Sequence, residues 1–224
     1  MGKNKHKNVK SSAKQEFLEQ QRQKRRRMNA VKDILLLLLI TGVVIGGFIG
    51  LLFAAGVFDY HPQVTADILI TIENYGSLHI ELYGNDAPET VENFLSLVNK
   101  GYYNGKSIFK LADDLAYMGS ETASATVIKG EFKENGFSNK ISHKRGTLSM
   151  VRSGEGNSDS SQFFIVKKDS PELNGKYAAF GKVTDGMEVI DSICKDIKTD
   201  ENGNIAKEDQ PKITSISTHA PHNH

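Results

Sequence analysis

The chain has 224 residues, with 28 Lys and Arg against 27 Asp and Glu, and hydrophobic residues make up 38% of it. This length allows one medium-sized domain with additional segments, and the single cysteine, Cys194, excludes an intrachain disulfide and a cysteine-based zinc cluster. The net charge of +1 is the sum of two parts of opposite charge. Residues 1–33 hold eleven basic and three acidic residues. This basic tail carries +8, so the rest of the chain carries −7.

An uncharged stretch of about 25 residues follows the basic tail, from Ile34 to Phe58. It is long enough to cross a hydrocarbon core of about 30 Å, so a transmembrane helix is predicted over residues 34–58. The basic residues before it predict a single-pass cell-membrane protein with a cytoplasmic N-terminus and an extracytoplasmic domain. A secretory signal cleaved near Ala54-Ala55-Gly56 is the alternative, although its apolar region would exceed the usual length of about 7–15 residues.

The basic tail is also a candidate surface for anionic lipid. Lipid contact is preferred over nucleic-acid binding because the tail adjoins the predicted span, and no nucleic-acid partner is expected. Within the span, Gly42, Gly46 and Gly50 have the small-xxx-small spacing that lets two helices approach closely. Glycine is also simply tolerated in membrane helices, so the spacing does not by itself predict a dimer.

A linker is predicted over residues 59–65, and a folded domain over residues 66–218. Two runs of alternating apolar residues open this domain: Ile68, Ile70 and Ile72, then Leu78, Ile80 and Leu82. Between them, Asn-Tyr-Gly at 74–76 has the composition of a turn. The pattern predicts a β-hairpin with one buried face.

A helix is predicted after this hairpin. Asp86 is placed to cap it, Pro88 fits its first turn, and Glu89 completes a capping box. Its apolar residues fall on one face, and Gly101 is placed to end it.

Short strands separated by turn residues follow, including Thr147–Val151 and Gln162–Val166. A second helix is predicted at Met187–Lys195 and a last strand at Lys212–Thr218. About 155 residues of short strands with two amphipathic helices predict a mainly β fold, a closed antiparallel barrel with helices covering its ends.

Two features suggest a metal and are rejected. The segment from Lys198 to Asp209 approaches a calcium loop, but a lysine stands where the first acidic ligand is required. The C-terminal residues 219–224 include His219, His222 and His224, which could hold a metal weakly, but a disordered tail is the preferred interpretation.

Five segments resemble the cyclophilin-type peptidyl-prolyl isomerases, specifically the bacterial, membrane-anchored kind, and they occur in the family's order. They read DAPETVENF from Asp86, GYYNG from Gly101, GTLSM from Gly146, SSQFFIV from Ser160 and LNGKYAAFGKVTDGMEVID from Leu173. The resemblance implies an eight-stranded barrel with two capping helices. It also implies isomerisation of proline-containing polypeptides without a metal or cofactor, here assisting the folding of secreted or cell-surface proteins.

The resemblance implies a site, and on one strand this chain departs from the family. Lys110 stands at the position of the catalytic arginine, and Phe109 replaces the histidine before it. Leu115 and Ala116 occupy the positions of the pocket phenylalanine and methionine of the family. Met118 occupies the position of its first glutamine. Lysine keeps the charge but lacks the planar fork of arginine, so low activity is expected.

The facing wall is closer to the family. Gln162 is predicted to be catalytic together with Lys110, and Phe164, Leu173 and Tyr177 match substrate-binding positions. Val151 lines the same edge. Two hypotheses stay open: a slow isomerase that uses Lys110 as a substitute donor, and a binding module that holds proline-containing segments or a partner protein without useful catalysis.

Overall fold

A computed structural model describes residues 28, 32, 35, 37–48, 51, 60–112, 114–122, 126–154 and 156–219. The chain divides into two compact units, residues 1–59 and 60–224. In the first unit, residues 37–48 are helical. Across all of the residues just given, no helix is both long enough and apolar enough to cross a membrane. Most of the basic tail, parts of the predicted span and linker, and His222 and His224 lie outside the described residues.

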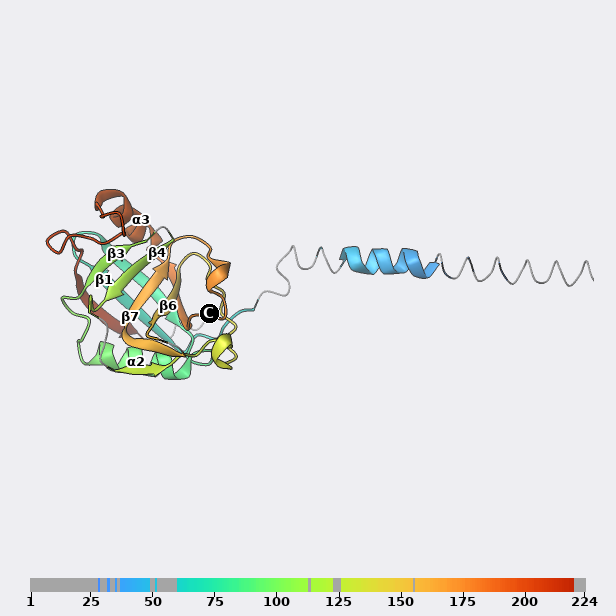
Figure 1. Ribbon diagram of the computed structural model, residues 1–224, viewed down its shortest axis with the longest axis horizontal. Helices are drawn as coiled ribbons and strands as arrows, with labels where there is room; N and C mark the ends of the chain where they lie inside the picture. The colour runs from blue at the N-terminus through green and yellow to red at the C-terminus, as the bar shows by residue number, and fades with distance from the viewer. Residues whose placement is uncertain are drawn as a thin grey trace, which may run out of the picture. The chain divides into compact units, whose positions relative to one another are not determined.

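The second unit is built of short strands with a helix at each of two opposite ends (Figure 1). Its strands are β1 (Ala66–Ile72), β2 (Gly76–Leu82), β3 (Ser107–Leu111), β4 (Leu115–Gly119), β5 (Val127–Lys129), β6 (Thr147–Arg152), β7 (Asn157–Val166), β8 (Ala179–Asp185) and β9 (Ile213–His219). Its helices are α2 (Pro88–Asn99) and α3 (Met187–Asp196), with short 3-10 helices η1 (Lys133–Asn135) and η2 (Pro171–Leu173).

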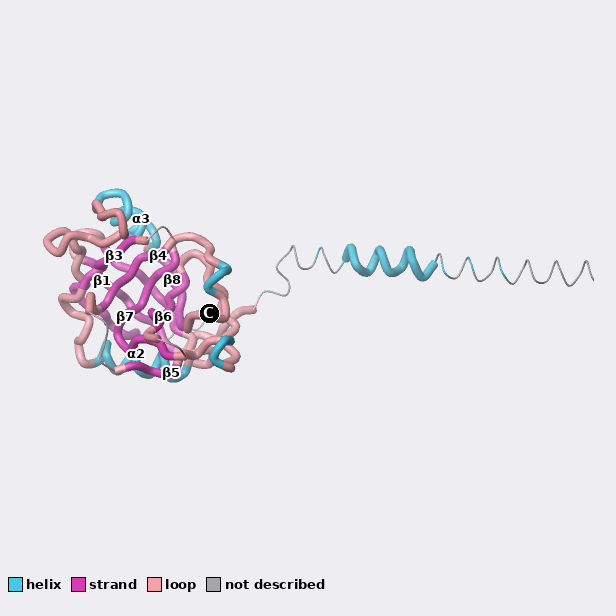
Figure 2. The backbone as a smooth tube through the Cα atoms, in the orientation of Figure 1, coloured by secondary structure: helices cyan, strands magenta, loops and turns pink. Residues whose placement is uncertain are grey.

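The strands form one antiparallel sheet that curls around the core (Figure 2). Neighbouring strands follow the order β3-β4-β7-β6-β8-β2-β1-β9, and β5 pairs with β7 outside this path. The mainly β architecture with two helices is confirmed, but the predicted closed, eight-stranded barrel is wrong. Among the described residues the sheet has nine strands, and its path is open because β3 and β9 share no ladder.

The loop before β9 explains the open seam. Gly203 and Ile205 of this loop exchange backbone hydrogen bonds with Leu111 and Phe109, at 2.8 and 3.0 Å. The loop thus occupies the edge of β3 that a closed barrel would offer to β9. Near the starts of the two strands, an isolated bridge joins Ser107 to Lys212, the residue before β9, and a few backbone hydrogen bonds accompany it.

The alternating residues of the β1–β2 hairpin lie inside the sheet, as predicted. Ile70 pairs with Leu78, and the turn between the strands has positive φ at Asn74 (64°) and Gly76 (118°). Aromatic rings complete the core: Phe94 of α2 lies 5.3 Å from Phe163, edge to face, measured between ring centroids. Such pairs add to the free energy gained by burying apolar surface.

The helix α2 begins where predicted, but its capping differs from the prediction. No side chain of its own first turn caps it. The buried carboxylate of Glu131 instead accepts hydrogen bonds from the backbone N–H groups of Glu89 (3.0 Å) and Thr90 (2.9 Å). Asp86 accepts from the Tyr60 hydroxyl. A carboxylate supplied from elsewhere in the fold satisfies the exposed N–H groups of a helix start equally well.

Other boundaries differ by one residue, with one larger exception. The strand β7 begins at Asn157 instead of Gln162, because β5 pairs with its first residues and extends it. The turn-forming residues that suggested a longer loop after β6 are therefore partly within a strand.

Candidate functional site

Strand alternation decides which residues of β4 and β7 can reach a ligand. The register pairs Met118 with Phe163 and Tyr117 with Phe164. Successive side chains of a strand point to opposite faces. Ala116 and Met118 belong to the hydrophobic core and have no exposed surface. They lie on the inner face of the strand, so a direct contact with substrate stays a prediction for both, and Tyr117, which was not predicted, takes the outward position.

The residue opposite Gln162 on β4 is Gly119. Its φ of 104° lies in the left-handed region, and a Cβ there would meet the carbonyl oxygen of Ser161. A side chain therefore does not fit at this position. The first glutamine of the family pattern, assigned to Met118 from the sequence, has no counterpart facing Gln162 from this strand.

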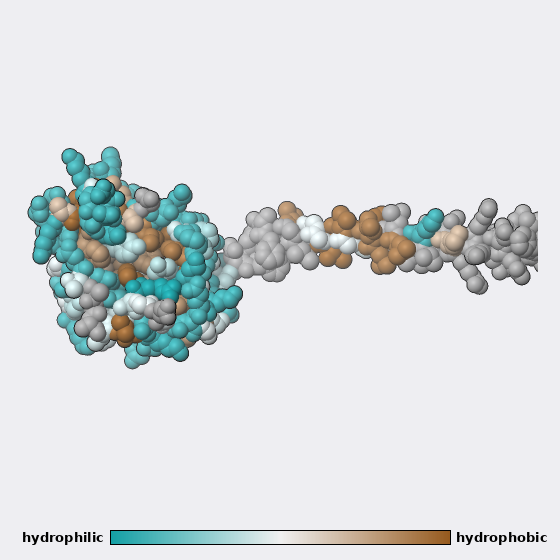
Figure 3. All heavy atoms as spheres, viewed as in Figure 1, coloured by the Kyte–Doolittle hydropathy of each residue, from teal (hydrophilic) through white to brown (hydrophobic). Residues whose placement is uncertain are grey.

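Outward-facing rings form an aromatic row across three neighbouring strands. The centroid of Phe109 on β3 lies 6.3 Å from that of Tyr117 on β4, which lies 5.7 Å from Phe164 on β7. Tyr177 meets Phe164 edge-on at 5.6 Å. Figure 3 shows apolar surface on this face, over the strands labelled β3, β4 and β7 in Figure 1. Burial, with a smaller contribution from nearby Tyr177, raises the pKa of Tyr117.

Phe164 is covered, with only 1% of its surface exposed. The rings of Tyr117, Tyr177 and His143 surround it. A ligand that packs on the aromatic row therefore first meets the two tyrosines, and it reaches Phe164 only if a tyrosine ring rotates aside.

His143 supports the row from behind and was not predicted. Its ring stacks 6.3 Å from Phe164, and its Nδ1 and Nε2 lie 3.1 Å from Asn174 Oδ1 and Ser149 Oγ. Because an amide oxygen only accepts, Nδ1 carries the proton and Nε2 accepts from the serine. Burial lowers the pKa of His143, so the ring is neutral at pH 7. No motif in the sequence marks this residue.

Lys110 lies at one end of the aromatic row. It pairs with Tyr117 in the β3–β4 ladder, and its Nζ lies 5.7 Å from the centroid of that tyrosine ring. On its other side it bridges to Asn204 in the loop before β9. Hydrogen bonds from Asn204, with a smaller contribution from the Lys110 charge, lower the pKa of Asp200 in the same loop. The structure thus places the predicted donor beside the row.

Gln162 lies two residues from Phe164 on β7, and only 8% of it is exposed. Its Nε2 donates to the carbonyl oxygens of Ser120 (2.6 Å) and Glu121 (3.3 Å). Its backbone N–H donates to Asp159 Oδ1 at 2.8 Å. The amide nitrogen therefore holds the segment after β4 in place, which fixes the orientation of the side chain.

The remaining predicted residues lie on three different elements. Leu115, Val151 and Leu173 are half-buried, on β4, β6 and η2, and their role in binding stays a prediction. Arg152 follows Val151, but its guanidinium is directed elsewhere, 3.2 Å from the Glu134 carboxylate.

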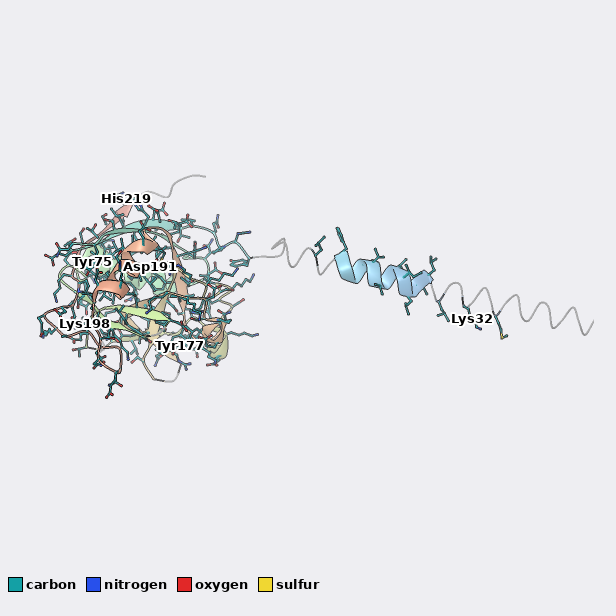
Figure 4. All side chains as sticks on the ribbon, turned by 90° about the horizontal axis from the view of Figure 1, so that it is seen from above. Lys32, Tyr75, Tyr177, Asp191, Lys198 and His219 are labelled. Carbon is teal, nitrogen blue, oxygen red and sulfur yellow. The ribbon has the colours of Figure 1, made fainter. Side chains whose placement is uncertain are left out.

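No group of three or more His, Cys, Asp or Glu is placed to hold a metal in the part of the chain that the structure describes. The one C-terminal histidine within that part, His219, lies on the side of the domain away from Tyr177 (Figure 4). The aromatic row, the ammonium of Lys110 and the amide of Gln162 are suited to bind and orient a peptide without a covalent step.

Solved structures of known fold match this domain. A cyclophilin type peptidyl-prolyl cis-trans isomerase of Cryptosporidium parvum, crystallised in the presence of the dipeptide Ala-Pro, gives a TM-score of 0.60. It is 26% identical in sequence, and the match covers 69% of this chain and 99% of that protein.

Sequence relatives extend from fungi to bacteria. A peptidyl-prolyl cis-trans isomerase-like 1 of Rhizopus delemar is 38% identical over 135 residues, covering 58% of this chain and 81% of the relative. A peptidyl-prolyl cis-trans isomerase of Acinetobacter baylyi is 39% identical over 133 residues, covering 54% and 68%. The family model for cyclophilin type peptidyl-prolyl cis-trans isomerases matches residues 68–218. The chain therefore belongs to the cyclophilin-type peptidyl-prolyl cis-trans isomerase family.

Proposed function

We propose that this cyclophilin is an isomerase of low activity, which binds a proline-containing segment on its aromatic row and turns the X–Pro bond slowly. The observation that carries the proposal is the placement of Lys110 and Gln162 on either side of Tyr117 and Phe164. A cation, apolar rings and an amide on one outward face supply a donor, a grip for the ring of proline and an orienting group.

Isomerisation of an X–Pro bond needs no catalytic group beyond these three. Resonance in the peptide bond gives a rotation barrier of about 18–20 kcal/mol, and an X–Pro bond isomerises unaided in tens to hundreds of seconds. In the twisted transition state the proline nitrogen regains its lone pair and accepts a hydrogen bond. A donor that meets this nitrogen only in the twisted geometry lowers the barrier without changing substrate affinity.

Three features of the site support low activity. The ammonium of Lys110 is a single point donor, whereas a guanidinium offers several donors in a fixed plane. The amide nitrogen of Gln162 already donates to its own chain. The ring of Phe164 is covered by two tyrosines. Loss of one well-placed transition-state donor costs about 3 kcal/mol, or about a hundredfold in rate.

The test is an isomerisation assay on the full-length chain in mild detergent, with a short Ala-Pro-containing peptide followed by NMR exchange spectroscopy. We expect a rate above background that falls about tenfold in Lys110→Ala and rises about tenfold in Lys110→Arg. Matched control variants at Lys182, an exposed residue of β8, should leave the rate unchanged. A background rate in all three forms would overturn the catalytic proposal.

A binding module is the second candidate, and the cover over Phe164 favours it. In this case the segment would bind to the tyrosines without being twisted. The same peptide would then broaden and shift the NMR signals of Tyr117 and Tyr177 while its cis and trans forms exchange at the uncatalysed rate. Binding that survives Lys110→Ala together with an unchanged exchange rate would favour the module over the enzyme.

We further propose that residues 34–58 anchor the chain in the cell membrane, with residues 1–33 cytoplasmic and in contact with anionic lipid. The uncharged sequence of this stretch and the exposed apolar side chains of residues 37–40 support the proposal. Its clients would then be secreted or cell-surface proteins. Extraction of the chain from membranes by alkaline carbonate, or protease digestion of the domain from the cytoplasmic side, would contradict it.

A further inference from the structure

A polar cavity of about 240 Å³ lies over the open seam of the sheet. Its walls come from the start of β3, the segment just after β4, and the loop before β9. Lys106, Lys207 and Lys212 line it together with one carboxylate, that of Glu121. This cavity is separate from the aromatic row and is not used by the proposed mechanism.

The floor of the seam cavity is a fixed hydrogen-bond network. The Ser107 hydroxyl donates to Gln210 Oε1 at 2.6 Å, and both residues are buried. Gln210 Nε2 donates in turn to Glu121 Oε1 and to the carbonyl oxygen of Ile205, each at 3.2 Å. One oxygen of the Glu121 carboxylate is thus engaged by this amide.

Basic side chains predominate around the seam cavity, and the acidic side chains of the same loop line a different cavity. Its three lysines and single carboxylate have a formal balance of +2, whereas the chain after residue 33 carries −7. The acidic residues of the same loop, Glu208 and Asp209, line a neighbouring cavity that shares only Gln210 with this one. A concave site lined by one sign of charge concentrates its potential on ligands of the opposite sign.

Gln162 connects the seam cavity with the aromatic row. Its backbone pairs with Gly119, and its side chain donates to the carbonyl oxygens of Ser120 and Glu121, which belong to the cavity wall. A peptide that lies on the row and continues past Gln162 therefore meets the cavity within a few residues, at about 3.3 Å per extended residue.

We infer that the seam cavity is a subsite for an anionic group on the bound segment, a carboxylate or a phosphoryl group carried a few residues from its proline. The inference rests on the proposed function for the position of the proline. Lys106, Lys207 and Lys212 supply the attraction, and the Ser107–Gln210–Glu121 network keeps the cavity open. The cyclophilin would thus select acidic or phosphorylated proline-containing segments.

The test uses the full-length chain in mild detergent and four peptides of equal length. They contain one Ala-Pro and, at a scanned position on either side, Glu, phosphoserine, Gln or Lys. Binding is measured by fluorescence anisotropy and isomerisation by NMR exchange spectroscopy, at about 50 mM salt, where screening is weak. The Glu and phosphoserine arms separate the two sources of the anion.

We expect at least one anionic peptide to bind about fivefold more tightly than its Gln counterpart, from two or three surface ion pairs. This ratio should fall below twofold in the double variant Lys207→Gln/Lys212→Gln. It should persist in the control double variant Lys182→Gln/Lys195→Gln, which removes the same charge from exposed positions elsewhere.

Equal affinity for the Glu, phosphoserine and Gln peptides at every scanned position would overturn the inference. So would an anion preference that survives in Lys207→Gln/Lys212→Gln. These results are distinct from failure of the proposed function: exchange at background with a lysine-dependent anion preference supports the subsite and removes only catalysis. Isomerisation without any anion preference removes only the subsite.

Discussion

Neighbouring residues of β7 face two different environments. Phe163 faces inward and packs against Phe94 and Tyr103, with centroids 5.3 and 5.5 Å away. Phe164 faces outward and is covered by Tyr117 and Tyr177, which are themselves half-buried. The peptide unit between the two phenylalanines separates the stabilising core from the proposed binding surface. Strand face and register therefore decide whether a residue of this sheet belongs to the core or to the proposed binding surface. Two residues that are adjacent in sequence can differ in this respect.

The largest expected effect sharpens this comparison. Phe163→Ala should lower the free energy of unfolding by about 3–5 kcal/mol, because the cavity it leaves is enclosed by the core. Tyr117→Ala, on the outward face of the adjacent strand, should cost about 1–2 kcal/mol, since solvent and neighbouring side chains can fill the space. Urea denaturation of the full-length chain measures both. Equal losses would show that the two faces are not energetically distinct.

A substitution on the inner face of β4 should cost stability without improving activity. Met118→Gln places an amide in the core beside Phe163, where an unsatisfied polar group costs about 2–3 kcal/mol. Leu115→Gln, at a half-buried position of the same strand, is the matched control and should cost about 1 kcal/mol or less.

The isomerisation assay gives the second reading of Met118→Gln. If Met118 faced the binding surface, the new amide would restore a family donor and raise the rate. A rise in rate with unchanged stability would therefore contradict the assignment of the two faces.

The smallest effect concerns the pH dependence contributed by His143. Burial lowers its pKa, outweighing the hydrogen bond that the ring donates to Asn174 and the charge of Glu172, both of which raise it. Below a pH of about 6.5 the histidine of the unfolded chain binds a proton, whereas the buried histidine of the folded chain does not. The free energy of unfolding therefore falls as the pH decreases. The slope from this one group is at most about 1.4 kcal/mol per pH unit.

His143→Gln tests this expectation, because it keeps a polar side chain and removes the titration. Urea midpoints measured from pH 7.5 to 5.0 should fall less steeply in the variant than in the natural sequence. If both slopes are the same, the histidine titrates similarly in the folded and unfolded states and its burial has no such consequence.

Periodicity determined much of the fold in advance. Alternating Ile and Leu residues gave the first hairpin with its buried face, and the apolar stripe before Gly101 gave α2. These features depend on local geometry, since a strand repeats every two residues and a helix every 3.6. The resemblance to cyclophilins rested on motifs along the chain, and it identified the family. The roles that it implies for Lys110, Gln162 and Phe164 stay predictions.

Tertiary structure decided what local rules leave open. The loop before β9 took the edge of β3 and opened the sheet, and Glu131 replaced the expected cap of α2. Both outcomes depend on hydrogen-bond partners that are distant in the sequence, so no local pattern specifies them.

The register of β4 was the decisive unknown for the site. A shift of one residue exchanges every inward and outward side chain, and it moved Met118 into the core and Tyr117 onto the surface. Pairing with β7 sets this register, because Gly119 is the residue that can approach the backbone of Ser161. The sequence by itself determined which family of fold forms and which strands carry the proposed site. The packing of one backbone against another decided which side chains lie on the outward face of these strands.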